Sequence, residues 1–254
     1  MSLSSPWIFR SSIKPKASIR LFCFPHSGAG AYVFKNWDFQ KFSELDIEVC
    51  AIRLPGHEGR FKEAAFNRFQ PLISALASAL LPYLDRPYAF FGHSLGAMIC
   101  FEWARQLRRE GRTGPDRLFV SARRAPQLLP VNPFSHTLTD ADLKTELRDY
   151  DGTPEAVLQN SELMDLFLPV LRADLAVNET YTYVDEAPLD CPISAFGGIR
   201  DDKVSVESIE AWANQTSKTF KVRFFSGGHF FIKHEVDSIL EAIAHDLEGN
   251  LVSS

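Results

Sequence analysis

The segment that decides the fold reads YAFFGHSLGAM and spans residues 88–98. An apolar run ends at Phe91, and the pattern Gly-His-Ser-Leu-Gly follows before apolar residues return with helical spacing. Gly-x-Ser-x-Gly between a strand and a helix is typical of a sharp turn that presents the serine hydroxyl at the edge of a sheet. The flanking glycines, Gly92 and Gly96, lack the Cβ atoms that would clash in such a turn. We therefore expect Ser94 to be a nucleophile.

Short apolar runs alternate along the chain with longer segments of helical periodicity. The apolar runs are residues 19–24, 47–54, 88–91, 118–121, 193–196 and 222–225, and the expected helices are residues 66–84, 95–109, 206–216 and 233–247. Most runs are apolar on successive positions, which is typical of parallel strands covered on both faces. The alternation predicts an α/β fold with one open, mostly parallel central sheet flanked by helices.

The interval from residue 126 to residue 192 interrupts this alternation, because it contains helical periodicity and no convincing strand. Thr139, three residues before Asp142, is placed to cap one expected helix. A turn is expected at residues 151–154, and residues 163–176 carry apolar side chains at helical spacing.

We expect one domain over residues 1–254, in which residues 127–190 form a helical lid insertion. The lid would lie over the carboxyl ends of the strands, where open α/β sheets bind ligands. Two additional packing helices without a lid role are the alternative interpretation.

The overall composition excludes several classes of protein. Of the 254 residues, 45% are hydrophobic and 23% are charged, and 27 Lys and Arg against 32 Asp and Glu give a formal net charge of −5. This balance provides no global attraction to nucleic acid or to an anionic membrane, so we expect neither partner. We expect no transmembrane helix, because no apolar run approaches about 18 residues, and we expect no signal peptide.

Cysteine usage indicates a reducing compartment. The chain has four cysteines, Cys23, Cys50, Cys100 and Cys191. Three of them lie inside or beside apolar segments, and the spacing of the four matches neither a disulfide framework nor a metal site. We expect reduced thiols in the core of a cytoplasmic protein.

A nucleophilic serine requires a base, and in this type of fold the acid and the base follow the serine in the order Ser, Asp, His. His229 follows the apolar run 222–225 on a Ser-Gly-Gly loop and is the expected base. Other histidines fit less well, because they precede the serine, lie in its turn or fall in or near the last expected helix: His26, His57, His93, His234 and His245.

The expected acid follows the apolar run 193–196. Two adjacent carboxylates occur there, Asp201 and Asp202. Neighbouring loop residues point in different directions, so one of them is expected to reach the imidazole of His229. We expect Asp201 to be the acid and keep Asp202 as the alternative.

An oxyanion hole requires two backbone N–H groups. One is expected from Leu95, directly after the nucleophile, and the other from the small-residue loop 24–31. In that loop we favour Ala29 first and Ser27 second. The alternative is a plain glycine turn. The spacings that bind phosphate or dinucleotides through glycine-rich loops are absent.

With these residues identified, the chain resembles the stand-alone type II thioesterases that accompany polyketide synthases and nonribosomal peptide synthetases. The resemblance runs nearly end to end and is carried by FPHSGAG at residues 24–30, RLPGHEGR at 53–60, GHSLG at 92–96, VSARRAP at 120–126, LFLPVLRAD at 166–174, GGIRD at 197–201 and GGHFF at 227–231. It implies an α/β-hydrolase fold with a helical lid.

The resemblance also implies an activity: hydrolysis of acyl or aberrant acyl and aminoacyl thioesters on the phosphopantetheine arm of carrier proteins. The family's nucleophile, acid and base correspond to Ser94, Asp201 and His229. Two positions depart from the family pattern. Ser27-Gly28-Ala29 stands where Ala-Gly-Gly is frequent, and Asp202 stands where proline is frequent, so the second oxyanion donor and the acid stay open.

The partners implied are acyl or peptidyl carrier protein domains of a polyketide or nonribosomal peptide synthase. No metal and no bound cofactor is required, and we expect a monomer. Candidate contacts to an acidic carrier domain are Arg60, Arg123, Arg124 and a helical cluster of Arg105, Arg108 and Arg109. The helical cluster is also interpretable as a solvated helix face.

Three alternative functions are compatible with the same residues. An acyltransferase or cyclase would pass the acyl group to an alcohol or amine, and a carboxylesterase would act on small esters. A non-catalytic scaffold would keep the triad without using it.

Overall fold

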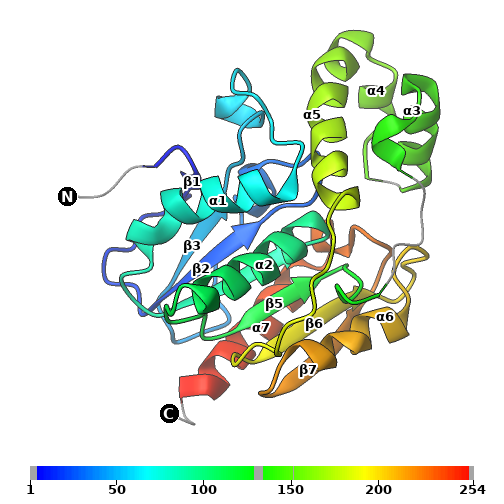
Figure 1. Ribbon diagram of the computed structural model, residues 1–254. Helices are drawn as coiled ribbons and strands as arrows, with labels where there is room; N and C mark the ends of the chain where they lie inside the picture. The colour runs from blue at the N-terminus through cyan, green and yellow to red at the C-terminus, as the bar shows by residue number, and fades with distance from the viewer. Residues whose placement is uncertain (1–4, 129–133, 151, 252–254) are drawn as a thin grey trace.

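The computed structural model describes residues 5–128, 134–150 and 152–251. Its centre is a sheet of seven strands in the order β1-β3-β2-β4-β5-β6-β7 (Figure 1). β1 is antiparallel to β3 and all other pairs are parallel, which confirms the predicted sheet. The strands are β1 Ile8–Phe9, β2 Ile19–Phe24, β3 Ile47–Ile52, β4 Tyr88–His93, β5 Leu118–Ser121, β6 Ile193–Gly198 and β7 Phe220–Phe225. The two-residue β1 was not expected, because it is too short to show a periodicity.

Helices cover both faces of this sheet. The α-helices are α1 Phe69–Leu80, α2 Leu95–Arg109, α3 Asp140–Asp149, α4 Glu155–Leu158, α5 Ser161–Glu179, α6 Val206–Glu210 and α7 Val236–Leu251. Short 3₁₀ segments are η1 Ala31–Phe34, η2 Glu58–Arg60, η3 Leu81–Tyr83, η4 Ser135–Thr137, η5 Ala211–Gln215 and η6 Phe231–Lys233. α1, α2 and α6 pack on one face and α7 packs on the other (Figure 1).

Three of the four expected helices differ from the observed ones. The helix expected over residues 233–247 is α7, which begins at Val236 and ends at Leu251. The helix expected over residues 66–84 is α1, which ends at Leu80 and continues as the 3₁₀ segment η3. Pro82 lies in that segment and has no N–H to extend the α-helical ladder. The helix expected over residues 206–216 is divided into α6 and η5, since apolar periodicity does not distinguish an α-helix from a 3₁₀ turn.

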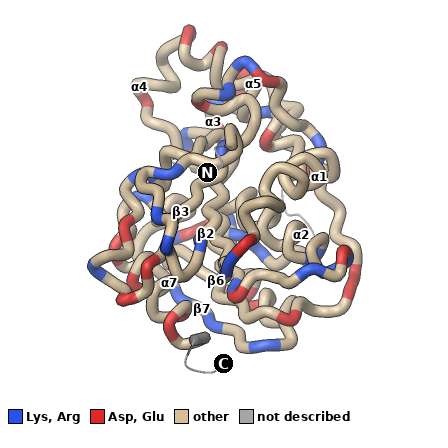
Figure 2. The backbone as a smooth tube through the Cα atoms, turned by 90° about the vertical axis from the view of Figure 1, so that its left-hand side faces the viewer, with Lys and Arg blue, Asp and Glu red and all other residues tan. Residues whose placement is uncertain are grey.

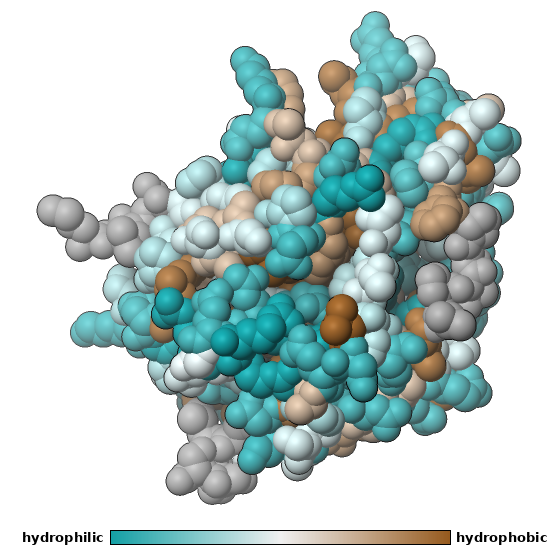
Figure 3. All heavy atoms as spheres, in the orientation of Figure 1, coloured by the Kyte–Doolittle hydropathy of each residue, from teal (hydrophilic) through white to brown (hydrophobic). Residues whose placement is uncertain are grey.

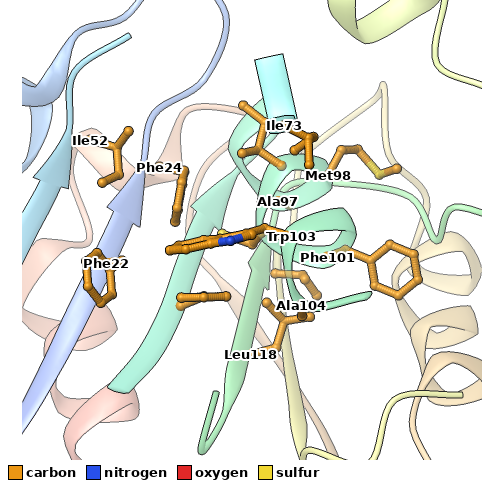
Figure 4. Close-up of a cluster of buried hydrophobic side chains, with 14 of the residues drawn as sticks. Phe22, Phe24, Ile52, Ile73, Ala97, Met98, Phe101, Trp103, Ala104 and Leu118 are labelled. Carbon is orange, nitrogen blue, oxygen red and sulfur yellow. The ribbon is translucent and has the colours of Figure 1, made fainter. Parts of the chain in front are cut away.

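The core lies between β2, β4 and α2. The ring of Trp103 stacks on Phe90 with the ring centroids 4.5 Å apart, and Phe22 and Phe24 meet the Trp103 ring edge-on (Figure 4). Each such fully buried side chain contributes about 1.5–3 kcal/mol from removal of apolar surface from water. The predicted reduced thiols are confirmed, because all four cysteines are buried and free.

α3, α4 and α5 rise above the carboxyl ends of the strands (Figure 1). Thr139 caps α3 as predicted, with its hydroxyl accepting a hydrogen bond from the N–H of Asp142. Of the expected turn at residues 151–154, Asp151 lies outside the described residues. Apolar side chains of these helices form a cluster of their own, separate from the clusters on the two sheet faces: Leu143, Leu158, Met164, Leu168 and Leu171.

The site is positioned by the order of the strands. β3 and β4 lie on opposite sides of β2, so the chain changes direction across the sheet between β2 and β4. The loops after these two strands therefore diverge and leave a crevice at their carboxyl ends, where open α/β sheets bind ligands. Those loops are residues 25–31 and the turn at Ser94.

Candidate active site

The turn at Ser94 has the geometry expected of a strained nucleophile. Ser94 adopts φ 54° and ψ −113°, a conformation that non-glycine residues rarely adopt. A Cβ on Gly92 would lie 2.2 Å from the backbone of Gly96, and a Cβ on Gly96 would lie 2.1 Å from the carbonyl oxygen of Phe24. Only glycine therefore allows the strand, the turn and α2 to approach this closely.

The structure brings together two of the three expected catalytic side chains. The Nδ1 of His229 lies 2.9 Å from Oδ2 of Asp201, and this carboxylate is 1% exposed. The other oxygen of Asp201 accepts hydrogen bonds from the backbone N–H groups of Lys203 and Val204. Asp202, by contrast, is 77% exposed and lies beside Lys203. Asp201 is thus placed to orient His229, and Asp202 is not.

Ser94 and His229 line the same cavity. The hydrogen bonds of the described residues do not include one between the Ser94 hydroxyl and His229. Such bonds are often long before substrate binds and tighten in the complex.

His93, which had no expected role, connects the nucleophile turn to the histidine loop. Its Nε2 lies 3.0 Å from the carbonyl oxygen of His229, and its Nδ1 lies 2.9 Å from the hydroxyl of Ser121. Burial lowers the pKa of His93 well below its ordinary value, so the ring is neutral. Because a carbonyl only accepts, Nε2 carries the proton and Nδ1 accepts from Ser121. His93 therefore holds the backbone that carries the expected base.

The loop after β2 shows which of the expected oxyanion donors already has an acceptor. The N–H of Ala29 donates to the carbonyl of His26 within the loop, and the N–H of Gly28 donates to Asp174. Among the described hydrogen bonds, the N–H of Ser27 has no acceptor, and Ser27 lines the cavity with Ser94. The first choice, Ala29, is therefore already engaged, and the second choice, Ser27, is the available donor.

A buried ion pair supports this loop from the helices above it. Oδ2 of Asp174, on α5, lies 2.7 Å from the nitrogen of Gly28 and 3.0 Å from Nε2 of His57. The Nδ1 of His57 lies 3.2 Å from the carbonyl oxygen of Pro55. Both partners of His57 only accept, so both ring nitrogens donate and the ring is cationic.

The pKa of His57 is consistent with a cationic ring. Burial alone would lower this pKa, but the hydrogen bond to Asp174 and the charge of Asp174 outweigh burial and raise it. The sequence segments 53–60 and 166–174 are thus joined at the site, although no local pattern signals their pairing.

Two other residues of segment 53–60, Arg53 and Glu58, support the same loop. Oε1 of Glu58 accepts the N–H of Tyr32, and Oε2 accepts Nε of Arg53. A Cβ on Gly30 would lie 2.1 Å from Oε1 of Glu58, so the loop packs directly on this side chain.

A cavity of about 700 Å³ lies between the sheet edge and α3–α5. This volume is within the usual range for small-molecule sites. Its wall includes Ser94 and His229 from the sheet side and apolar side chains from the helices above: Leu143, Leu147, Val157, Phe167, Leu171 and Leu175. Because these side chains are apolar, the cavity is suited to an acyl chain. The outer face seen in Figure 3 is mostly hydrophilic, with only small hydrophobic patches.

The arginines expected to contact a carrier domain lie in three different environments. Arg60 is buried, paired with Glu63 at 2.6 Å and stacked over Trp7, so it offers no docking surface. Arg123 and Arg124 are half-buried on the cavity wall.

The arginines of the helical cluster are all paired with glutamates. Arg105, Arg108 and Arg109 all pair with Glu186, and Arg105 and Arg109 also pair with Glu102. These arginines attach α2 to the chain that returns from α5. In the view of Figure 2, basic and acidic residues are interspersed along the backbone rather than gathered by sign.

The described residues provide neither a metal site nor a membrane-spanning helix. In residues 5–128, 134–150 and 152–251, no group of three or more His, Cys, Asp or Glu side chains is arranged to hold a metal ion. No helix in the same part of the chain has both the length and the apolar character needed to cross a membrane.

Comparison with known proteins gives a consistent result. The family model for the thioesterase domain matches residues 19–247. The chain is 40% identical over 247 residues to the gramicidin S biosynthesis protein GrsT of Aneurinibacillus migulanus, covering 97% of this chain and 96% of that protein.

Two solved structures are similar in fold and sequence. The RedJ thioesterase from the prodiginine pathway of Streptomyces coelicolor superposes with a TM-score of 0.84 at 37% identity, covering 91% of each chain. The type II thioesterase BorB from the borrelidin biosynthetic cluster superposes with a TM-score of 0.86 at 34% identity. That alignment covers 96% of this chain and 99% of BorB.

Proposed function

Because the chain belongs to the thioesterase family, we propose that it hydrolyses acyl thioesters carried on the phosphopantetheine arm of carrier protein domains. The proposed partners are acyl or peptidyl carrier proteins of a polyketide or nonribosomal peptide synthase, since relatives are named for such pathways. The observation that carries the proposal is the hydrogen bond from His229 to the buried carboxylate of Asp201, with His229 and Ser94 lining one cavity.

The proposed reaction has two steps. The hydroxyl oxygen of Ser94 attacks the thioester carbonyl while Nε2 of His229 takes the hydroxyl proton. The tetrahedral intermediate collapses, the carbon–sulfur bond breaks, and the carrier thiol leaves with that proton. Water then attacks the acyl-enzyme with His229 as base, and the free acid leaves Ser94. Asp201 holds Nδ1–H of His229 and stabilises the imidazolium in both steps.

The oxyanion is proposed to receive the backbone N–H groups of Leu95 and Ser27. One such donor is worth about 3–4 kcal/mol in the transition state. A thiolate leaves more readily than an amine, so positioning and oxyanion stabilisation carry most of the work. These groups supply the nucleophile, the base and the electrostatic stabilisation, so the proposed mechanism uses no metal and no bound cofactor.

The test is release of free acid from a short-acyl phosphopantetheinyl carrier protein by the wild-type protein and by Ser94→Ala. We expect rapid release that the substitution abolishes, because no other group forms the acyl-enzyme. An oxoester with the same acyl group is the substrate control. Faster turnover of the oxoester would favour a carboxylesterase. Transfer of the acyl group to an added amine or alcohol in place of water would favour an acyltransferase.

A further inference from the structure

Two arginines line the cavity without an acidic partner among the residues that the structure describes. Arg123 and Arg124 follow β5 directly, and both lie on the wall of the cavity that contains Ser94 and His229. The ion pairs of the described residues include neither arginine. The other arginines discussed above, Arg60 and the α2 cluster, are each paired with glutamate.

The hydrogen bonds of the two side chains are also incomplete. One Nη of Arg123 donates to the neutral amide oxygen of Asn178 at 2.7 Å. The Nε atoms of Arg123 and Arg124 are both buried without an acceptor in the described part of the chain. Partly desolvated cations with open donors are costly unless an anion completes them. Burial lowers the pKa of Arg123 to about 10, with the charge of Arg124 acting in the same direction, and Arg123 stays cationic at neutral pH.

The carboxylates on the described wall of the cavity are directed to other groups. Glu179 accepts hydrogen bonds from His136 and from the backbone N–H of Ser135, and Glu146 accepts the hydroxyl of Ser135. Lys203, which also lines the cavity, lies 3.4 Å from Asp202 outside it. Neither of these glutamates forms an ion pair with Arg123 or Arg124 in the described part of the chain.

The backbone that carries the arginines is held in place. Ala122 adopts φ 49°, and its N–H donates to Phe196 on β6. The indole N–H of Trp212 donates to the carbonyl of Arg123 at 2.7 Å. A non-glycine residue in the left-handed region is strained, and such strain is retained where the neighbouring structure enforces it.

The arginines begin close to the nucleophile. His93 pairs in register with Ser121 at the end of β5, and the N–H of Ser94 donates to the carbonyl of Ser121, two residues before Arg123. The two arginines therefore follow backbone that is hydrogen-bonded to the Ser94 turn, and both line the cavity that contains Ser94.

We infer that Arg123 and Arg124 form a subsite for an anionic oxygen group of the thioester substrate. The planar guanidinium matches carboxylate and phosphate with paired hydrogen bonds. A thioester on a phosphopantetheine arm has two sources of such a group, a carboxylate on the acyl portion and the phosphate of the arm. The inference rests on the proposed function, and it specifies which chemical group of the thioester substrate the same cavity recognises.

The experiment compares substrate pairs that differ by one anionic group. Adipoyl and hexanoyl thioesters of N-acetylcysteamine test the acyl carboxylate, and hexanoyl phosphopantetheine and hexanoyl pantetheine test the phosphate. The measured quantity is the ratio of kcat/KM within each pair. In Arg123→Gln or Arg124→Gln, we expect the ratio to fall about 10- to 100-fold in one pair, as loss of a charge-assisted hydrogen bond predicts.

The matched control is Arg112→Gln. Arg112 is exposed, lies three residues after the end of α2 and is paired with Glu110, so this variant removes the same charge without touching the cavity and should keep both ratios. Arg123→Lys keeps the charge but loses the paired geometry, and an intermediate ratio is expected. If Arg123→Gln does not fold, Arg124→Gln and Arg123→Lys carry the test.

The outcomes distinguish an acyl carboxylate from the phosphate of the arm, and they distinguish failure of the subsite from failure of the proposed function. A fall in the adipoyl ratio assigns the subsite to an acyl carboxylate, and a fall in the phosphopantetheine ratio assigns it to the arm. Unchanged ratios in both pairs overturn the subsite. If the wild-type protein hydrolyses none of these thioesters, the proposed function fails on its own. Calorimetric titration with adipate and with phosphopantetheine then decides, because binding lost in the glutamine variants supports the subsite and no binding to the wild-type protein overturns it.

Discussion

At the scale of single residues, Ser94 shows how the site stores strain. A φ of 54° on a serine costs on the order of 1–3 kcal/mol, which the surrounding strand and helix must offset. In return, the hydroxyl stands clear of the sheet edge and the N–H of Leu95 begins α2, where the helix amino end favours negative charge. The same backbone turn thus places the proposed nucleophile beside one proposed oxyanion donor.

The choice between two adjacent carboxylates is also a single-residue question. We expect Asp201→Asn to lower kcat by about a thousandfold to ten-thousandfold, because the amide no longer holds the His229 tautomer or stabilises the imidazolium. Asp202→Asn is the matched control and should keep wild-type turnover, since Asp202 is exposed. Steady-state hydrolysis of one thioester by both variants measures this. A larger loss in Asp202→Asn would show that the acid has been assigned to the wrong residue.

At the scale of elements, one buried ion pair connects α5, the loop after β2 and the 53–60 segment. Asp174 on α5 accepts from the N–H of Gly28 and from His57, so the helix above the cavity fixes the loop that is expected to hold the oxyanion. We call Asp174 and His57 positioning residues, because they act on the site through this loop.

Loss of the ion pair should therefore lower turnover more than substrate binding. In Asp174→Asn we expect kcat to fall about 10- to 100-fold with little change in KM, as for partial loss of an oxyanion donor. Asp165→Asn, an exposed site on the same helix, is the control and should behave as wild type. Equal effects of the two variants, or a change in KM alone, would contradict a positioning role.

The same pair predicts a pH dependence of stability. Burial would lower the folded-state pKa of His57, but the hydrogen bond to Asp174 and the charge of Asp174 outweigh burial and raise this pKa. The charge of Glu58 adds to the increase. The stabilisation is therefore complete below the unfolded value of about 6.5 and is lost as pH rises through the raised folded value. The difference in unfolding free energy between wild type and Asp174→Asn should be about 3–5 kcal/mol at about pH 6 and smaller at about pH 8.5. Urea unfolding at both pH values measures it, and a difference that grows with pH would refute the cationic His57.

At the scale of the whole molecule, the hydrophobic interior consists of separate clusters. The two large clusters lie on the two faces of the sheet, and the third is confined to the helices above the cavity. A cluster with few apolar connections to the core can open without global unfolding.

We therefore expect α3 and α4 to open before the sheet does. Their amides should exchange hydrogen at a lower opening free energy than those of β4. Leu143→Ala should lower that local value by about 2–5 kcal/mol, because it leaves a cavity in the small cluster, and should spare β4. Leu118→Ala, on β5 in the large cluster, is the control and should lower protection throughout. A parallel loss of protection in α3 and β4 on Leu143→Ala would show that the two regions unfold as one unit.

The sequence by itself determined what depends on neighbouring residues. Residues 88–109 specify strand, turn and helix through apolar periodicity and two glycines, and the observed α2 begins and ends where expected. The order of Ser94, Asp201 and His229 along the chain was equally readable, because each follows a recognisable apolar run. The resemblance of the whole chain to type II thioesterases rested on such local segments.

Only the tertiary structure decided what depends on residues distant in sequence. It showed that Asp201 rather than Asp202 reaches His229, that the N–H of Ala29 is already engaged, and that the Arg123–Arg124 pair faces the cavity. It also joined His57 to Asp174. The physical reason is that a hydrogen bond or an ion pair depends on where two chain segments meet in space. A local pattern of side chains contains the chemistry of each partner but not their separation.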